Sequence, residues 1–151
     1  MKKIIVLMVA TSFVAHGCAI FKMWQKEWRL FDISENYSYY YDVKSIKWSA
    51  DNIVRVRLKS IAKGNDAIEW ELNERQKRGL SLKGYENYAY SEDIYEIDCK
   101  ERKFRTLSGA DYDNEGQTLS FYTTESLLWH NIPSDSTIEN LAKFRSVCDT
   151  N

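Results

Sequence analysis

The stretch IVRVRLKSI, residues 53–61, decides the fold class of this 151-residue chain. Three aliphatic side chains alternate along it with three cationic ones: Val54, Val56 and Leu58 with Arg55, Arg57 and Lys59. Successive side chains of a strand point to opposite faces of its sheet. The stretch therefore predicts an antiparallel strand with one buried face and one solvated, basic face.

Further strands are predicted on both sides of this one. Turn-forming residues 49–52 favour a hairpin that pairs residues 46–48 with the strand that follows. The tyrosine-rich segment NYSYYYDV, residues 36–43, also alternates and carries residues that favour strands. Four more strands are expected downstream, at residues 86–90, 94–99, 103–112 and 117–123, with a hairpin turn at 113–116.

One helix is predicted in the middle of the chain. Residues 67–78 are rich in helix formers, the Gly64–Asp66 stretch offers a cap, and Gly79 suits the end. Ile68, Leu72 and Arg75 recur at helical spacing. A β-strand at residues 67–72 remains an alternative.

A second helix of about thirteen residues is predicted at the C-terminus. Ser136 and Glu139 have the spacing of a capping box, and four residues share one helical stripe: Ile138, Leu141, Ala142 and Cys148. We therefore expect an α+β fold, an antiparallel β-sheet with the C-terminal helix packed on one face.

The N-terminus has the layout of a bacterial lipoprotein leader. Lys2 and Lys3 precede an uncharged run, residues 4–15, that is too short to span a bilayer of about 30 Å as a helix. Small residues then lead to Cys18, which we expect to be lipidated. The predicted organisation is a signal peptide at 1–17, a lipidated cysteine and tether at 18–27, and a single domain at 28–151. An ordinary signal peptide, with Cys18 lost or free, is the alternative.

The chain contains three cysteines, an awkward number for an exported protein. If Cys18 carries lipid, Cys99 and Cys148 remain as a pair that an oxidising compartment would join. Both fall on predicted inward-facing positions, so we expect a disulfide between the last helix and the sheet. Two buried, reduced thiols are the alternative, and a metal site is disfavoured because His130 is the sole histidine after the leader.

Charge and motifs exclude several classes of function. Without Lys2 and Lys3, acidic residues outnumber basic ones by three, which argues against a nucleic-acid binder. We find no nucleophile motif, phosphate loop or metal-ligand spacing, and so expect no enzyme, cofactor or metal. A hydrolase using paired carboxylates is a remote alternative; the acids considered are Asp93, Glu96, Asp98, Asp111 and Asp113.

Two basic groups are candidates for a ligand surface. The first is the strand row of Arg55, Arg57 and Lys59; the second is the cluster of Lys100, Arg102, Lys103 and Arg105. They could bind an acidic polysaccharide or an acidic segment of a protein. The alternative is a solvated strand face with cross-strand ion pairs.

The order of short motifs along the chain resembles the surface-adhesin protein E family of bacterial lipoproteins. The resemblance rests on the following residues: Trp28, Tyr40-Tyr41-Asp42, Ser45-Ile46, Val54-Arg55-Val56, Tyr95-Glu96-Ile97-Asp98-Cys99, Arg102-Lys103-Phe104-Arg105, Tyr112-Asp113, Gly116, Trp129, Ile132-Pro133-Ser134 and the closing helix with Cys148.

This resemblance implies an antiparallel sheet with a C-terminal helix, in a lipoprotein anchored in the outer membrane and exposed at the surface. It implies an adhesin-like binding module for a protein ligand such as host extracellular matrix, and leaves a homodimer open. The alternative is a periplasm-facing structural or assembly lipoprotein of the envelope with no host ligand.

Overall fold

The computed structural model describes residues 26–124, 128–144 and 147–148. In these ranges the chain forms one antiparallel sheet of eight strands with two α-helices and two 3₁₀ turns. The strands are β1 Trp28–Ile33, β2 Tyr37–Asp42, β3 Lys47–Ala50, β4 Ile53–Ala62, β5 Tyr88–Asp98, β6 Lys103–Asp113, β7 Thr118–Thr123 and β8 His130–Asn131. The helices are α2 Asn65–Lys77 and α3 Thr137–Ala142, and the 3₁₀ turns are η1 Val43–Ser45 and η2 Tyr85–Asn87. The α+β prediction is confirmed.

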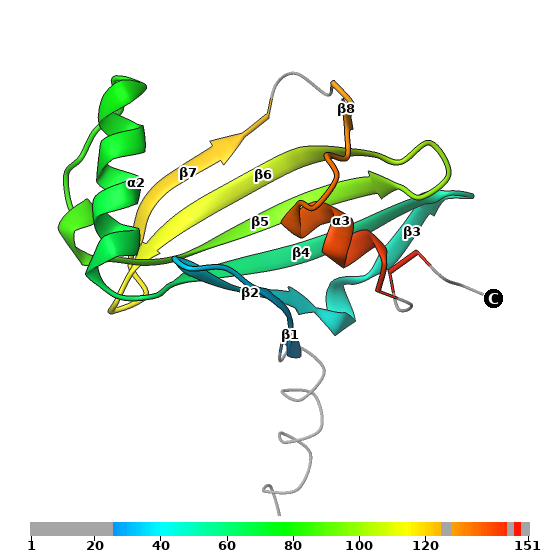
Figure 1. Ribbon diagram of the computed structural model, residues 1–151, viewed down its shortest axis with the longest axis horizontal. Coiled ribbons are helices and arrows are strands. Elements are labelled where there is room, and N and C mark those ends of the chain that lie inside the picture. Colours follow the sequence, from blue (N-terminus) through cyan, green and yellow to red (C-terminus); the bar gives the residue numbers. More distant parts are fainter. Residues whose placement is uncertain (1–25, 125–127, 145–146, 149–151) are drawn as a thin grey trace, which may run out of the picture.

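The strands follow the order β1-β2-β4-β5-β6-β7, and β3 and β8 pair at the ends of β4 and β6 (Figure 1). The long central strands β4, β5 and β6 pair along most of their length. The predicted hairpin between residues 46–48 and β4 is confirmed as β3–β4, and the turn at 113–116 joins β6 to β7.

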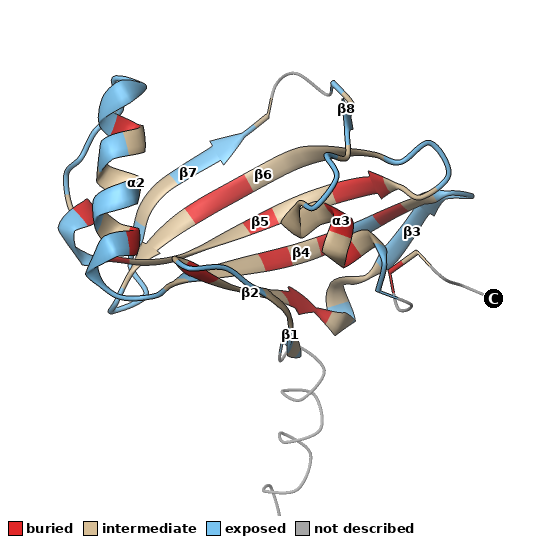
Figure 2. Ribbon diagram, in the orientation of Figure 1, coloured by how far each residue is buried: buried red, intermediate tan, exposed pale blue. Residues whose placement is uncertain are grey.

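The main core lies between one face of the sheet and α3 (Figures 1 and 2). Val54, Val56 and Leu58 are buried there, as their alternation predicts. The remaining buried members come from β2, β5 and the C-terminal segment: Tyr41, Ile97, Leu141 and Val147. Burying such aliphatic side chains stabilises a fold by about 1.5–3 kcal/mol each.

A second core lies under α2. Ala67 and the edge of Leu72 pack on three buried tyrosines of the sheet and η2: Tyr37, Tyr85 and Tyr88. Most of α2 is otherwise exposed (Figure 2). Gly79, which follows the helix, has a φ of 67°, a conformation that glycine adopts at little cost and that ends helices. The predicted helix, rather than the alternative strand, is therefore confirmed.

The C-terminal helix is shorter than predicted. It ends at Ala142 after six residues, and Cys148 lies in a turn beyond it rather than on its stripe. Ser136 caps the helix as predicted, because its hydroxyl accepts a hydrogen bond from the Glu139 amide. A six-residue helix is too short to be stable alone, so burial of Leu141 must hold it in place.

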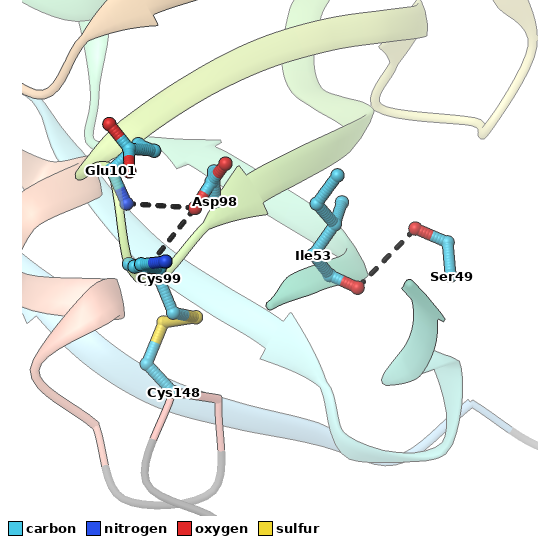
Figure 3. The surroundings of a disulfide bond; sticks show 7 residues. Ser49, Ile53, Asp98, Cys99, Glu101 and Cys148 are labelled. Atoms are coloured by element: carbon cyan, nitrogen blue, oxygen red, sulfur yellow. Dashed lines mark hydrogen bonds between the residues drawn. A yellow bond between two sulfur atoms is a disulfide. The ribbon is translucent and has the colours of Figure 1, made fainter. Parts of the chain in front are cut away.

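The predicted disulfide between Cys99 and Cys148 is confirmed, with Cα atoms 5.6 Å apart (Figure 3). It joins the turn after β5 to the segment after α3. The Asp98 carboxylate caps that turn, because it accepts hydrogen bonds from the Lys100 and Glu101 amides. The bridge therefore closes the α3 end of the core.

Three strand predictions need correction. Residues 86–90 and 94–99 do not form two strands; η2 comes first and β5 then runs unbroken from Tyr88 to Asp98. The polar residues Ser91 to Asp93 interrupt the hydrophobic pattern in sequence but pair normally in the sheet. Strands β1 and β8 were not predicted.

The leader and Cys18 lie outside the described residues. Within the described ranges, no helix is both long and apolar enough to cross a bilayer.

Candidate functional site

The sheet has two unlike faces. Both helices lie on one of them, which we call the covered face. The other, the open face, carries the predicted basic row and no described helix. Side chains of β4, β5 and β6 make up its centre: Arg55, Arg57, Lys59, Tyr90, Glu92, Ile94, Glu96, Arg105 and Tyr112.

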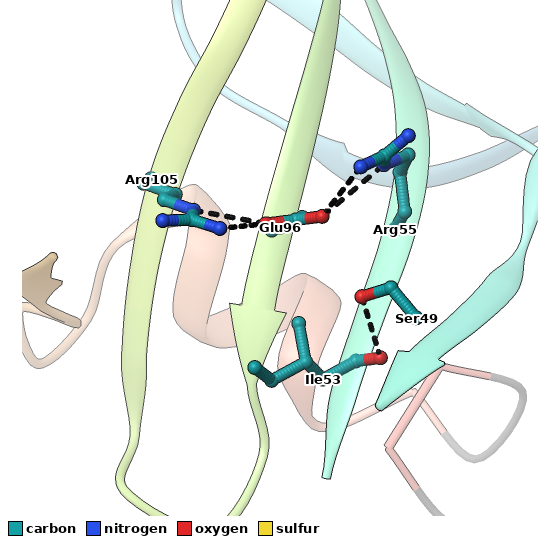
Figure 4. A network of polar contacts seen from close by, with 5 residues as sticks. All are labelled: Ser49, Ile53, Arg55, Glu96 and Arg105. Carbon is teal, nitrogen blue, oxygen red and sulfur yellow. Dashed lines mark hydrogen bonds and ion pairs between the residues drawn. The ribbon is translucent and has the colours of Figure 1, made fainter. Parts of the chain in front are cut away.

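A three-strand ion network crosses the open face (Figure 4). The Glu96 carboxylate accepts hydrogen bonds from the guanidinium of Arg55, Nη2 to Oε1 2.7 Å, and from that of Arg105, Nη2 to Oε2 2.6 Å. The residue is 3% exposed although no helix covers it, because the two arginines shield it. The Arg105 guanidinium also lies 4.4 Å from the ring centre of Trp129.

The pKa of Glu96 reflects this network. Burial alone would raise the pKa, but the hydrogen bonds and charges of Arg55 and Arg105 outweigh burial and lower it. Glu96 therefore stays ionised and holds the two guanidinium groups in place.

A second group on the open face combines cations with aromatic rings. The Lys59 ammonium lies 3.7 Å from the ring centre of Tyr90 and 5.6 Å from that of Trp28. Its nearest carboxylate is Glu92, at 3.9 Å. Tyr90 stacks on Tyr112 with ring centres 4.8 Å apart. Burial lowers the pKa of Lys59 despite the neighbouring carboxylate.

The structure brings together four of the six predicted ligand-surface residues. Arg55, Arg57, Lys59 and Arg105 share the open face. Lys100 and Arg102 instead lie in the turn between β5 and β6. Arg102 reaches toward α3, where its guanidinium contacts the Glu139 carboxylate at 2.7 Å. The first predicted basic group thus lies on the open face, and the second is split, with Arg105 on the open face and Lys100 and Arg102 in the turn.

The covered face contains a groove between α2 and the strands β5, β6 and β7. Its volume is about 710 Å³. One wall comes from α2 and the loop after it, the floor from the three strands, and the other wall from the segment that leads into β8. The residues lining it include Glu71, Arg75, Tyr88, Asp93, Asp111, Tyr122 and Thr124.

Asp93 lies on the groove floor and is 9% exposed. Its carboxylate accepts a hydrogen bond of 2.6 Å from the Tyr122 hydroxyl. The pair packs directly over Gly109, where a Cβ atom would lie 2.0 Å from Asp93 Oδ1 and 2.5 Å from the Tyr122 hydroxyl. Only glycine therefore leaves room for the pair. Burial raises the pKa of Asp93, against the hydrogen bond from Tyr122, and Asp111 raises it further.

Asp111 lies deeper toward α2. Its carboxylate accepts a hydrogen bond of 2.5 Å from the Tyr85 hydroxyl and one of 3.4 Å from Arg75 Nη1. Arg75 in turn stacks on the Tyr85 ring at 3.7 Å and donates from Nε to the Ser81 carbonyl. On α2, burial and then Asp111 raise the pKa of Glu71.

The groove was missed by sequence reasoning. Asp93 and Asp111 were noted as acids, but nothing in the sequence showed that β5, β6 and α2 bring them into one cavity. Gly109 inside a strand was the available signal, since a glycine there often marks a close approach of other groups.

The geometry offers little for catalysis or metal binding. The described part of the chain holds no cluster of three metal-ligating side chains. His130, on β8, is exposed and its ring lies beside that of Phe104 at 5.9 Å. No described residue pairs with it as a nucleophile would.

The chain was compared with known proteins. Three solved structures of Haemophilus influenzae protein E are similar, each with a TM-score of 0.41. One is 19% identical and is matched over 78% of this chain and 88% of that chain. A second crystal form is 18% identical and is matched over 78% of this chain and 92% of that chain. Protein E of a non-typeable strain is 16% identical and is matched over 91% of this chain and 80% of that chain. No curated protein sequence matches.

The sequence profile named Surface-adhesin protein E matches residues 28–149, which span the whole described domain and most of the chain. The chain belongs to the surface-adhesin protein E family.

Proposed function

We propose that this adhesin-like surface protein is a non-enzymatic binding module whose ligand docks on the open face of the sheet. The ligand we favour is an acidic segment of a protein. Family membership supports a role in adhesion. The open face supports the position of the site, because this broad surface of the domain has no described helix over it.

The observation that carries the proposal is the mixture of side chains on that face. Five cations and three carboxylates lie on this face of the strands β4, β5 and β6, which leaves an excess of two positive charges: Arg55, Arg57, Lys59, Lys103 and Arg105 against Glu92, Glu96 and Asp98. Four aromatic rings border or join them: Trp28, Tyr90, Tyr112 and Trp129. Aromatic and arginine side chains are the residues that most often dominate protein interfaces. A net positive surface would select an acidic partner.

Charge reversal at Arg57 tests this site. Arg57 lies between Arg55 and Lys59 in the row, and Arg57→Glu leaves the Glu96 network in place. We expect about a tenfold or greater loss of binding to immobilised extracellular-matrix proteins, measured by biolayer interferometry. Binding by the wild type should also weaken as salt rises from about 50 to 300 mM, because exposed charges are screened.

Lys77→Glu is the matched control, since it makes the same charge change on α2, away from the open face. Equal losses in the two variants would indicate a general charge effect and contradict the site. Binding to immobilised heparin, with no binding to matrix proteins, would indicate an acidic polysaccharide instead. Binding that changes neither with salt concentration nor in either variant would refute the open face as the site.

We also propose that lipid on Cys18 holds the domain at the outer membrane. Cys18→Ser should release the protein from the membrane fraction, and unchanged sedimentation would contradict the anchor. Proteolysis of intact cells then tests surface exposure. A domain that resists protease until the outer membrane is opened would favour the periplasm-facing structural or assembly role.

A further inference from the structure

The groove on the covered face is a second candidate binding site, separate from the open face. It has about 710 Å³ of space, within the range of roughly 300–1,000 Å³ typical of ligand pockets. Its lining joins polar groups with the aromatic side chains of Tyr88 and Tyr122.

The carboxylates of the groove exceed its cations. Glu71, Asp93 and Asp111 line it, and Arg75 is the cation among the buried lining residues. Arg75 is committed to internal contacts with Ser81, Asp111 and the Tyr85 ring. Arg78 lies on an exposed position at the rim. An anion entering the groove would therefore meet three carboxylates and no uncommitted buried cation among the described lining residues.

The electrostatics of the carboxylates point the same way. Burial raises the pKa of Glu71 and that of Asp93, and in both cases the charge of Asp111 raises it further, although Arg75 and Arg78 offset part of the rise at Glu71. Groups that repel one another in this way gain from a positive charge placed between them. Aromatic faces in the same lining add attraction for a cation.

We propose that this groove binds a positively charged side chain, lysine or arginine, presented by a peptide segment. The carboxylates of Asp93 and Asp111 receive the charge. The rings of Tyr88 and Tyr122 contact the aliphatic stem. The two faces of the sheet thus select ligands of opposite charge.

The probe is the capped peptide acetyl-Gly-Arg-Gly-amide, with the citrulline and glutamate versions as neutral and acidic controls. Binding is followed by ¹H–¹⁵N NMR of the chain carrying Cys18→Ser. We expect the arginine peptide to shift the amides of Asp93, Asp111 and Tyr122 with a Kd at or below about 1 mM. The control peptides should shift them at least about fivefold less. No shift, or equal shifts with all three peptides, would overturn the proposal.

Variants locate the site. Asp93→Asn keeps shape but removes charge, and should weaken binding at least about fivefold. Asp51→Asn is its matched control, because it makes the same substitution at an exposed position in the turn between β3 and β4, and it should leave binding unchanged. Equal effects of the two would overturn the site.

Thr124→Lys provides a second variant, because Thr124 lines the groove and is partly exposed. A tethered ammonium there should compete with the peptide and weaken binding even if Asp93→Asn does not fold. Retained binding in a folded Thr124→Lys protein would overturn the proposal. A Thr124→Lys protein that loses the arginine peptide but still binds matrix proteins would show that the groove and the open face are separate sites.

Discussion

Asp93 and Glu96 lie three residues apart on β5, yet the two faces of the sheet treat their carboxylates in opposite ways. Glu96, on the open face, is held by two guanidinium groups, and its pKa falls. Asp93, on the covered face, accepts hydrogen bonds from the hydroxyls of Tyr122 and Ser91, and burial and the charge of Asp111 raise its pKa. Both are nearly inaccessible to water.

Burial alone therefore does not determine whether a carboxylate of this sheet is ionised. Burial penalises the charged form of both residues, so the partners determine the outcome. On the open face, arginines of the neighbouring strands outweigh burial. On the covered face, no cation among the described residues offsets the burial of Asp93, in line with the cation site proposed for the groove. Four substitutions test this contrast.

Cys148→Ser should lower the free energy of unfolding most, because it removes the disulfide that ties the segment after α3 to the turn after β5. The loop-closure model gives about 3–4 kcal/mol for a bridge across this sequence separation. Urea unfolding should show that loss. The NMR signals of α3 should broaden while those of α2 stay sharp. Cys18→Ser is the control, and a loss below about 1 kcal/mol for Cys148→Ser would show that packing of Leu141 and Val147 alone holds this end.

Gly109→Ala should come next, because its Cβ would overlap both members of the Asp93–Tyr122 pair. Overpacking of this kind costs about 1–3 kcal/mol. Thermal unfolding measures the loss, and the groove should lose the arginine peptide. Ser108→Ala, on the neighbouring position of β6, is expected to change stability by less than about 0.5 kcal/mol. Equal stability of the two variants would contradict the close packing.

Glu96→Gln should destabilise the protein by about 1–2 kcal/mol at pH 7, a modest figure because half of the Arg55 side chain is exposed. The folded pKa of Glu96 lies below its unfolded value, so its contribution is present above about pH 4 and is lost as pH falls through the folded pKa. The difference in free energy of unfolding between wild type and variant should therefore become smaller as the pH falls. A gap that stays constant down to about pH 2 would contradict the network's role.

Asp93→Asn should change the free energy of unfolding least, and it should raise it where the other three substitutions lower it. Its folded pKa is raised, so the folded protein binds a proton more readily than the unfolded chain, and ionised Asp93 destabilises the fold at neutral pH. We expect a gain of less than about 1 kcal/mol at pH 7, measured by urea unfolding. The gain should vanish as pH falls toward about 4. A loss of stability at pH 7 would show that the Tyr122 hydrogen bond requires the carboxylate.

Local pattern predicted most of the fold. The alternation of residues 53–61 located β4 and assigned its two faces correctly, because strand geometry depends on neighbours in sequence. The cysteine count led to the disulfide, and the glycine at 79 marked the end of α2. The predicted extent of the last helix was wrong, because its stripe continued in sequence beyond the point where packing supports a helix.

The candidate sites were less accessible to sequence reasoning. The basic row was visible in the sequence, but its pairing with Glu96 and Glu92 depends on the register between β4 and β5. The groove was invisible, because its residues come from α2, β5, β6, β7 and the segment before β8.

By itself the sequence determined which residues alternate, where turns and helix ends fall, and which cysteines could pair, since these properties depend on residues close together in the chain. The tertiary structure was needed to show that Glu96 meets two arginines and that Asp93 meets a tyrosine. These contacts depend on strand order and register, which bring distant residues within a few ångströms, and electrostatic interactions are strong at those distances alone.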